Sequence, residues 1–164
     1  MPNHVEMDIS VSGPVNDLLQ FKEFSRDGEA LLSADKFIPY PDKFKTLDKQ
    51  AEEERKNGNY SFRDGFNSGG YEWCIENWGT KWGIYDTEMV GEKLGKKVGT
   101  IKYSAQSAWS PPLKVIKAMS DKFPTLKISV KYFECGAGYK GVFVVKGGEI
   151  ITNTEAKYSG RRGG

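Results

Sequence analysis

The sequence predicts an α+β domain in which helices cover one face of an antiparallel sheet. Segments 4–12 and 125–134 alternate apolar and polar residues with the period of two that is typical of half-buried strands. Segments 15–26 and 113–123 carry apolar residues at helical spacing. With two further strands between these helices, the order becomes βαββαβ, the split βαβ arrangement of ferredoxin-like folds. An extra C-terminal hairpin follows.

The first strand and the first helix are tightly joined. Ser12 and Gly13 provide a cap, and Pro14 suits the first position of a helix that continues to about Arg26. The apolar residues of the strand alternate with polar neighbours and are predicted to face the core; they are Val5, Met7, Ile9 and Val11.

The second half of the chain repeats this entry into a helix. Two strands joined by a polar hairpin connection lie within 84–108. Ser110 is placed to cap the next helix, and Pro111 to occupy its first position. After the strand at 125–134, a final hairpin turns at Gly147–Gly148.

A large insertion, at about 27–83, separates the first helix from the second strand. It contains a charged helix from Asp42 to about Asn57 and a segment, 71–82, that holds three of the four tryptophans. Residues 142–145 of the fifth strand are apolar on both faces, which predicts that a second layer covers them. We expect the insertion to be this cover.

Length and composition exclude several classes of protein. The 164 residues suit one domain, expected over 1–158, and the Gly/Arg tail at 159–164 is expected to be flexible. No apolar run approaches the roughly twenty residues that cross a bilayer, and the N-terminus lacks the pattern of a secretory signal, so we expect a cytoplasmic protein without a membrane segment. A net charge of +2 gives no global attraction to nucleic acid.

Several short motifs occur together along the chain. It opens with MPN, has SGP after the first strand, and continues with WCIENWGTKW at 73–82, SAWSPP at 107–112 and GAGYKG at 136–141. This combination resembles the YubB-type family of phage and plasmid proteins. The resemblance runs along most of the chain and implies a mobile-element protein with a ferredoxin-like domain. It implies no catalytic residues.

The sequence offers little for catalysis or cofactor binding. Gly136–Gly141 match the G-x-G-x-x-G pattern of dinucleotide-binding loops, but the following VFVVK predicts a strand where that mechanism requires a helix. With one histidine, His4, and two separated cysteines, Cys74 and Cys135, a structural zinc site is not expected. We therefore predict no catalytic residue, no metal and no cofactor.

The uncovered face of the sheet is predicted to be polar. Its first strand presents Glu6 and Asp8, between a strand that carries Lys102 and a strand that carries Lys127 and Lys131. Carboxylates at this place repel phosphate, and no aromatic ring is available in the middle of the face to stack a base. We interpret the face as a cross-strand charge ladder rather than an RNA-binding platform.

The tryptophan segment is predicted to be largely helical. Tyr71, Ile75, Trp78 and Trp82 then share one face, and Tyr71, Trp78 and Trp82 are expected to form a structural aromatic cluster that docks the insertion on the sheet. Polar residues interleaved with the rings are also typical of a pocket. The candidate binding residues are Trp73, Glu76, Asn77, Lys81, Trp109 and Ser110.

Our leading hypothesis is a non-enzymatic binding protein of a phage or plasmid, whose target is a host or phage protein or a small ligand. The first alternative is a small enzyme that uses Glu72, Glu76 or Asp86 as acid, base or metal ligand. The second is a nucleic-acid-binding module, with affinity that falls steeply with salt. It would use Lys93, Lys96, Lys97, Arg161 and Arg162. The sequence leaves the oligomeric state open.

Overall fold

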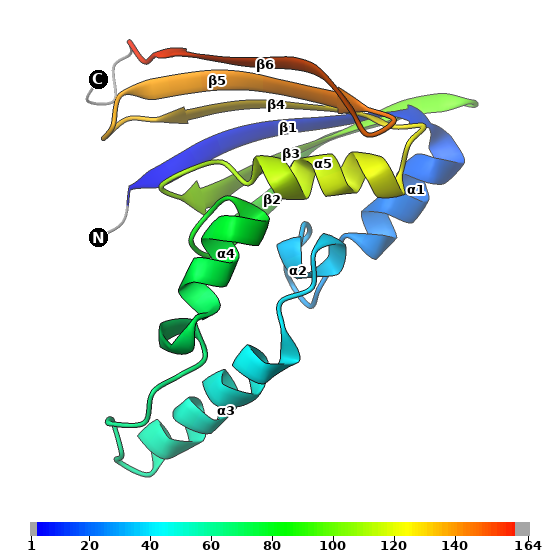
Figure 1. The fold of residues 1–164 in the computed structure, drawn as a ribbon. Coiled ribbons are helices and arrows are strands. Elements are labelled where there is room, and N and C mark those ends of the chain that lie inside the picture. The colour runs from blue at the N-terminus through cyan, green and yellow to red at the C-terminus, as the bar shows by residue number, and fades with distance from the viewer. Residues whose placement is uncertain (1–2, 160–164) are drawn as a thin grey trace.

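One antiparallel sheet with helices on a single side forms the body of the molecule (Figure 1). This computed structural model describes residues 3–159. Within these residues the strands are β1 (His4–Pro14), β2 (Tyr85–Leu94), β3 (Val98–Ala108), β4 (Lys127–Glu134), β5 (Tyr139–Lys146) and β6 (Glu149–Lys157). The helices are α1 (Val15–Phe24), α2 (Ala34–Phe37), α3 (Asp42–Lys56), α4 (Gly70–Trp78) and α5 (Leu113–Lys122), with a 3₁₀ turn, η1 (Phe66–Ser68).

The strand order confirms the predicted ferredoxin-like fold. Neighbouring strands follow the order β2-β3-β1-β4-β5-β6, and every pair is antiparallel. The segment from β1 to β2 and the segment from β3 to β4 each connect strands that are separated by a third strand, as in the split βαβ unit. β5 and β6 form the extra hairpin, which extends the sheet beyond β4.

The core lies between the sheet and helices α1 and α5. The alternation in β1 predicted its buried face correctly, because Val5, Met7, Ile9 and Val11 are at most 2% exposed. The neighbouring strands and the two helices supply the remaining large side chains of this core, including Leu18, Phe21, Tyr103, Ile116, Met119, Ile128 and Phe143.

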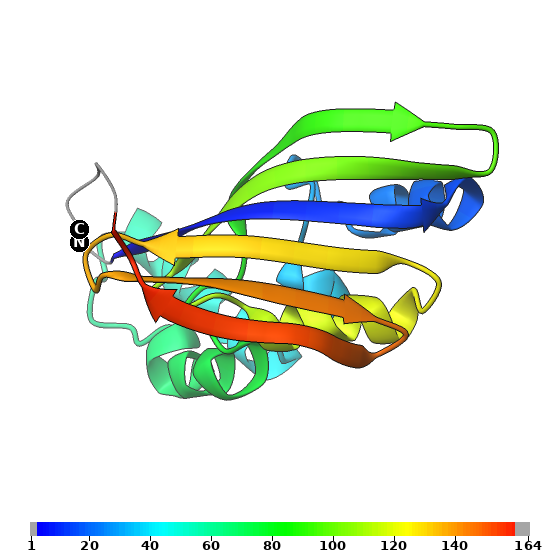
Figure 2. The same cartoon turned by 90° about the horizontal axis from the view of Figure 1, so that it is seen from above.

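The insertion packs on the helix side of the sheet and leaves the opposite face uncovered (Figures 1 and 2). Its charged helix, α3, lies close to the predicted bounds and buries Phe44 and Ala51. The expectation that the insertion covers the outer side of β5 is therefore wrong. Val144 of β5 is instead flanked in register by Ser129 of β4 and Thr152 of β6, and these neighbours reduce its exposed fraction to 9%.

The register places opposite charges side by side on the uncovered face. Asp8 of β1 lies opposite Lys131 of β4, and Ser10 lies opposite Lys102 of β3. The predicted placement of acidic residues on β1 beside lysines on β4 is therefore confirmed, although no ion pair among residues 3–159 joins Asp8 to Lys131. An exposed ion pair stabilises a protein little, because water screens the two charges and ordering two long side chains costs entropy.

Gly141 of β5 gives the first testable prediction. The ring of its cross-strand neighbour Tyr132 lies over it, so that a Cβ at position 141 would stand 2.2 Å from the Tyr132 hydroxyl oxygen and 2.6 Å from the Thr154 carbonyl oxygen. We expect Gly141→Ala to destabilise the protein by about 2–3 kcal/mol, measured by urea unfolding.

A second glycine of the sheet serves as the control. A Cβ at Gly91 of β2 meets nothing closer than Lys102 Cβ, at 3.7 Å. Gly91→Ala should therefore change the free energy of unfolding by less than about 1 kcal/mol. Equal effects of the two substitutions would contradict the proposed packing of Tyr132 on Gly141.

Candidate functional site

Four aromatic rings of the insertion pack on one another at the edge of the core, and we call them the inner aromatic cluster: Tyr40, Phe44, Trp73 and Trp78. The Tyr40 ring centroid lies 5.6–5.8 Å from those of the other three, and Trp73 and Trp78 meet edge to face at 5.3 Å. Trp78 is 7% exposed and its indole Nε1 donates a hydrogen bond to the Ile38 carbonyl at 2.8 Å. The polar atom of this large ring is therefore satisfied inside the fold.

Helix α4 buries the face formed by Gly70, Cys74 and Trp78. Gly70 allows the helix to approach the inner aromatic cluster, since a Cβ there would lie 2.1 Å from the Tyr40 hydroxyl oxygen. The helix ends at Gly79, whose φ of 75° is in the left-handed region that glycine adopts at little cost.

The predicted aromatic face of this helix is wrong. Tyr71 and Ile75 are 40% and 41% exposed, and Trp82 lies beyond the end of the helix with 43% of its surface exposed. Tyr71 packs against Phe66, while Trp78 alone of the proposed structural cluster is buried. The periodicity failed because the helix stops four residues before Trp82, and because the small residue Gly70 sets the close-packed face.

Two side-chain hydrogen bonds join the end of α4 to the end of β3, and we call them the clasp. The buried Thr80 hydroxyl donates to the Ala108 carbonyl at 2.9 Å. The Ser110 hydroxyl donates to the Gly79 carbonyl at 2.6 Å. Ser110 was expected to cap α5, but that helix begins at Leu113 with Pro112 at its N-cap, so the hydroxyl serves the clasp instead.

The clasp sets five residues at one end of the sheet, which we call the outer aromatic surface: His4, Lys81, Trp82, Tyr85 and Trp109. Lys81 Nζ lies 4.7 Å from the Trp82 ring centroid and 5.7 Å from that of Trp109. Trp82 meets Tyr85 at 6.2 Å, and the Tyr85 hydroxyl is hydrogen-bonded to His4 Nδ1 at 2.7 Å. Trp109 is the most open of the tryptophans, with 59% of its surface exposed.

The backbone around Trp109 is held on both sides. Its φ of 72° is a conformation that residues with a side chain seldom adopt. The Trp109 amide donates to the Asn3 carbonyl at 2.9 Å, and the Trp109 carbonyl accepts from the Tyr139 hydroxyl at 2.7 Å. Burial, with the nearby Glu134 carboxylate, raises the pKa of Tyr139, so this hydroxyl stays protonated as a donor. An exposed tryptophan is thus fixed in a strained conformation.

The structure separates the candidate binding residues from one another. The structure brings Lys81 and Trp109 together in the outer aromatic surface, and it places Trp73 in the inner aromatic cluster. Asn77 is half-buried and donates from its amide nitrogen to the Trp73 carbonyl at 3.0 Å within α4. The Glu76 carboxylate is on an exposed face of α4, and its backbone carbonyl accepts from Lys114 of α5.

Sequence reasoning missed His4, Tyr85 and Tyr139 as parts of this arrangement. His4 and Tyr85 are 81 residues apart, and they meet because the starts of β1 and β2 lie at the same end of the sheet. An available signal was the split βαβ topology itself, which makes these two strands parallel with β3 between them. In this topology β1 and β2 both start at the end of the sheet where β3 finishes. The topology therefore predicts that His4 and Tyr85 lie near Trp109, which follows β3.

The G-x-G-x-x-G segment forms a turn that holds its own carboxylate. Glu134 is 2% exposed and accepts hydrogen bonds from the amides of Gly136, at 2.7 Å, and Ala137. Strand β5 follows from Tyr139, as predicted. Because Glu134 already satisfies the amides that would otherwise meet a phosphate, this turn is not a nucleotide site.

The cysteines and carboxylates offer little reactive chemistry. Cys74 is 2% exposed, and burial, with the Asp48 carboxylate adding to it, raises the pKa of its thiol to about 11. It is therefore not a thiolate at neutral pH. Residues 3–159 contain no group of three His, Cys, Asp or Glu side chains placed to hold a metal ion. The tail residues 160–164, with Arg161 and Arg162, lie outside the described residues.

Comparison with known proteins gives a family and a fold. A family model described as the ferredoxin-like domain in Api92-like protein matches residues 77–162. The chain is similar to the crystal structure of the protein api92 from Yersinia pseudotuberculosis, with a TM-score of 0.57, 10% sequence identity, and coverage of 98% of this chain and 99% of that chain. The search of curated proteins found no match. Among the helices of residues 3–159, none is long and apolar enough to cross a membrane.

The clasp predicts a measurable contribution to stability. Thr80→Val keeps the shape of the side chain but removes the hydroxyl that donates to the Ala108 carbonyl, which then keeps only its bond from the Ser110 amide, so we expect a loss of about 1 kcal/mol in urea unfolding. Thr154→Val on the exposed strand β6 is the matched control, with an expected change within about 0.5 kcal/mol. A Thr80→Val protein as stable as the control would show that the clasp does not hold the insertion.

The buried thiol predicts a pH dependence. The ordinary pKa of a cysteine thiol is 9.0, and the pKa of Cys74 in the folded protein is about 11. Between these two pH values the thiol loses its proton in the unfolded chain but keeps it in the folded protein, and this difference favours unfolding. Stability that is fully present below about pH 9 is therefore lost between about pH 9 and pH 11. Cys74→Ala should make this alkaline loss shallower than in the wild type, as measured by urea midpoints at a series of pH values. An unchanged slope would rule out Cys74 as a contributor.

Proposed function

We propose that this chain, which belongs to the family of Api92-like proteins with a ferredoxin-like domain, is a non-enzymatic binding protein that contacts a protein partner through the outer aromatic surface. The observation that carries the proposal is the exposure of Trp82 and Trp109, 43% and 59%, on either side of one lysine. Tryptophan is among the residues most often found at the centres of protein interfaces, because its large ring buries much surface at little entropic cost.

The rigidity of this surface supports binding. The clasp fixes the segment that carries Lys81 and Trp82, and two backbone hydrogen bonds fix Trp109 in its left-handed conformation. Backbone strain of this kind costs about 1–3 kcal/mol and persists where the surrounding structure holds it, often at functional sites. A surface whose rings are already ordered loses less entropy when a partner binds.

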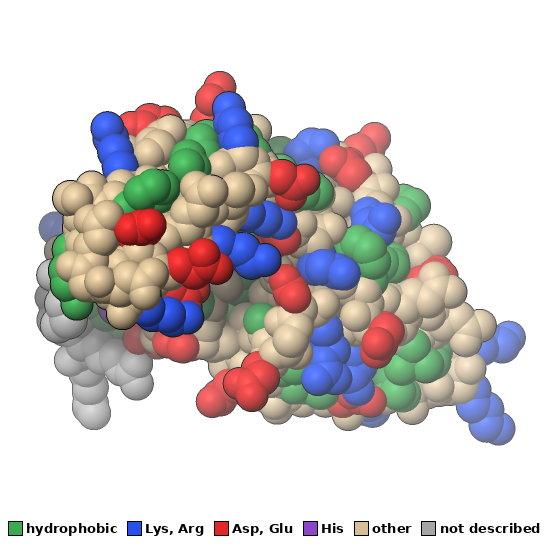
Figure 3. Space-filling view, turned by 90° about the horizontal axis from the view of Figure 1, so that it is seen from below, with side chains coloured by type: hydrophobic (Ala, Val, Ile, Leu, Met, Phe, Trp, Pro, Cys, Tyr) green, Lys and Arg blue, Asp and Glu red, His purple; other side chains and the backbone are tan. Residues whose placement is uncertain are grey.

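The chemistry of the surface indicates the kind of partner. The two indoles supply apolar area, and the Lys81 ammonium between them is placed to meet a carboxylate. A protein segment with apolar side chains and an acidic residue satisfies both requirements. On the helix-covered side, Lys and Arg side chains are interspersed with Asp and Glu (Figure 3), and this mixture does not favour a polyanion such as nucleic acid.

The carboxylates of the enzymatic alternative give it little support. Glu72 and Glu76 lie on the exposed face of α4, and Asp86 is exposed in β2. Exposed carboxylates without a metal-binding group around them lack the water-excluded setting in which acid–base catalysis is effective. We therefore favour binding over catalysis.

The biological setting is part of the same proposal. We place the protein in the cytoplasm of a bacterium that carries a phage or plasmid. The motifs at 71–82 and 107–112, which resemble YubB-type proteins, support this origin. These motifs also supply Lys81, Trp82 and Trp109. The neighbouring genes in the source genome would check the origin independently.

Paired substitutions test the proposed interface. Wild-type protein and a Trp82→Ala/Trp109→Ala variant would be used to capture partners from host lysate, with quantification by mass spectrometry. We expect a specific partner that the wild type retains and the variant loses at least about tenfold, since aromatic anchors cost 2 kcal/mol or more when truncated. The retained partner should then bind purified wild-type protein directly.

The matched control removes two exposed aromatic rings from the insertion instead. Tyr60 is 78% exposed and Tyr71 is 40% exposed, and neither belongs to the outer aromatic surface. Tyr60→Ala/Tyr71→Ala should retain the partner. A set of captured proteins that is the same for all three baits would contradict the proposal.

A further inference from the structure

The uncovered face of the sheet carries a second site with different chemistry. We propose that the depression over β3, β1 and β4 binds a compact anion, a phosphate-bearing small molecule, between the ammonium groups of Lys102, Lys127 and Lys131 and the hydroxyls of Ser10 and Ser129. The depression measures about 500 Å³ and is lined by these side chains. None of its residues belongs to the outer aromatic surface, so the inference does not depend on the function proposed above.

The register of three strands builds the site. Lys102, Ser10 and Ser129 lie in one row across β3, β1 and β4. Lys127 and Lys131 stand two residues before and after Ser129 on β4, on the same face. Three positive charges therefore surround a pair of hydroxyl groups, which is an arrangement that suits the several oxygens of a phosphate group.

The polar groups of the site are available to a ligand. Among residues 3–159, no hydrogen bond or ion pair uses the side chains of Lys102, Lys127, Lys131, Ser10 or Ser129. Some lysines elsewhere do have a partner. Lys22 pairs with Glu92 at 2.7 Å and Lys45 with Asp35 at 2.9 Å. No carboxylate of residues 3–159 pairs with the lysines of the depression, so these side chains are open to a partner from solution.

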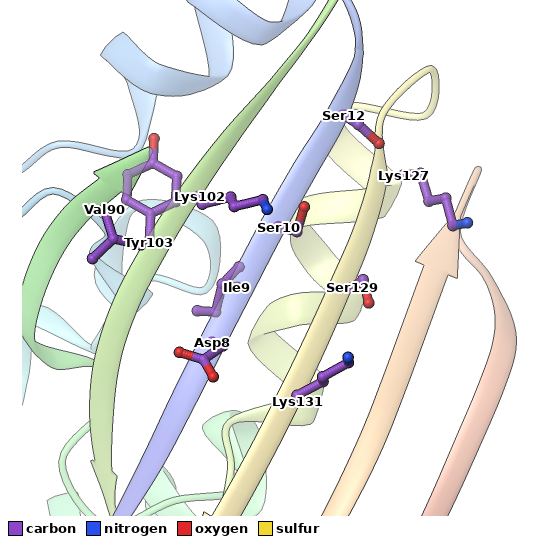
Figure 4. Close-up of a pocket in the computed structure, with 10 residues that line it drawn as sticks. All are labelled: Asp8, Ile9, Ser10, Ser12, Val90, Lys102, Tyr103, Lys127, Ser129 and Lys131. Atoms are coloured by element: carbon purple, nitrogen blue, oxygen red, sulfur yellow. The ribbon is translucent and has the colours of Figure 1, made fainter. Parts of the chain in front are cut away.

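Figure 4 shows how these side chains lie. Lys102 extends over β1 toward Ser10 and Lys131 lies beside Ser129 along β4, whereas Lys127 extends over the end of β5 and would turn inward to contact a bound anion. Asp8 is turned away from Lys131, toward β3. Gly91 of β2 lies opposite Lys102 in register and adds no side chain beside its stem.

Charge also limits the size of the ligand. Asp8 borders the depression on one side, and the next depression along β1 and β2 is lined by Glu6, Asp8, Asp86 and Glu88. A polyanion that continued along β1 in this direction would meet four carboxylates, and like charges at these distances repel. A compact anion would contact the three lysines of the depression without reaching these carboxylates. This charge boundary favours a small phosphate compound over a nucleic acid.

Titration with inorganic pyrophosphate at low ionic strength tests the proposal, with amide chemical shifts as the readout. We expect saturable shifts at positions 8–12, 102–104 and 127–131. Lys102→Gln/Lys127→Gln/Lys131→Gln should weaken binding at least about tenfold, since each lost charge contact contributes modestly and three act together. Asp8→Asn should strengthen binding about two- to fivefold, because a neighbouring negative charge is removed.

The hairpin between β2 and β3 supplies the matched control. Lys93→Gln/Lys96→Gln/Lys97→Gln removes the same charge near the same end of the sheet and should weaken binding less than about threefold. The proposal is overturned if the wild type shows no saturable binding, if both triple variants weaken binding equally, or if Asp8→Asn weakens it. It is also overturned if a single-stranded oligonucleotide binds more than about 100-fold tighter than pyrophosphate and loses that affinity in the hairpin variant.

Discussion

The clasp between Thr80, Ala108, Ser110 and Gly79 fixes the relation between the insertion and the sheet. The insertion separates α1, which ends at Phe24, from Gly79 and Thr80 of the clasp, and most of it extends away from the sheet (Figure 1). The hydroxyl groups of Thr80 and Ser110 hold the C-terminal end of α4 against the end of β3. Burial of Trp78 contributes more surface, but an apolar contact has little directional preference. The hydrogen bonds determine where Lys81 and Trp82 stand relative to Trp109.

Because only one face of the sheet is covered, the protein has two separate surfaces of different chemical character. The outer aromatic surface lies where the insertion meets the end of the sheet, and it is apolar with one central lysine. The depression around Ser10 and Ser129 lies on the uncovered face and is polar and basic. Each has a different physical origin: the first depends on how the insertion is attached, and the second follows from the alternation of side chains along three central strands. A change in one surface need not disturb the other.

Strand alternation and topology could be predicted well from the sequence, and the details of the tryptophan segment could not. The alternation in β1 identified both its buried residues and the outward Asp8, and the charged helix α3 was found almost to its ends. The orientation of α4 was missed because three aromatic residues and Ile75 suggested an apolar stripe. The decisive residues were small: Gly70 and Cys74 allow close approach, and Gly79 ends the helix. The meeting of His4 with Tyr85 depends on three-dimensional closure, which local periodicity does not encode.

The two ends of the described residues lie at the same end of the sheet, beside the turn at Gly136–Gly138, and this matters for handling the protein. The Asn3 carbonyl accepts from the Trp109 amide, so the first described residue lies beside the outer aromatic surface. At the other end, the Tyr158 amide donates to the Gly138 carbonyl at 2.7 Å and its ring stacks on Phe133 of the uncovered face, with centroids 5.2 Å apart. An affinity tag fused before Asn3 would emerge next to Trp109, and one fused after Tyr158 would emerge next to Phe133. A tag at either terminus would therefore lie at the end of the sheet that carries the outer aromatic surface, and a tag inserted in the hairpin between β2 and β3 would leave this end free.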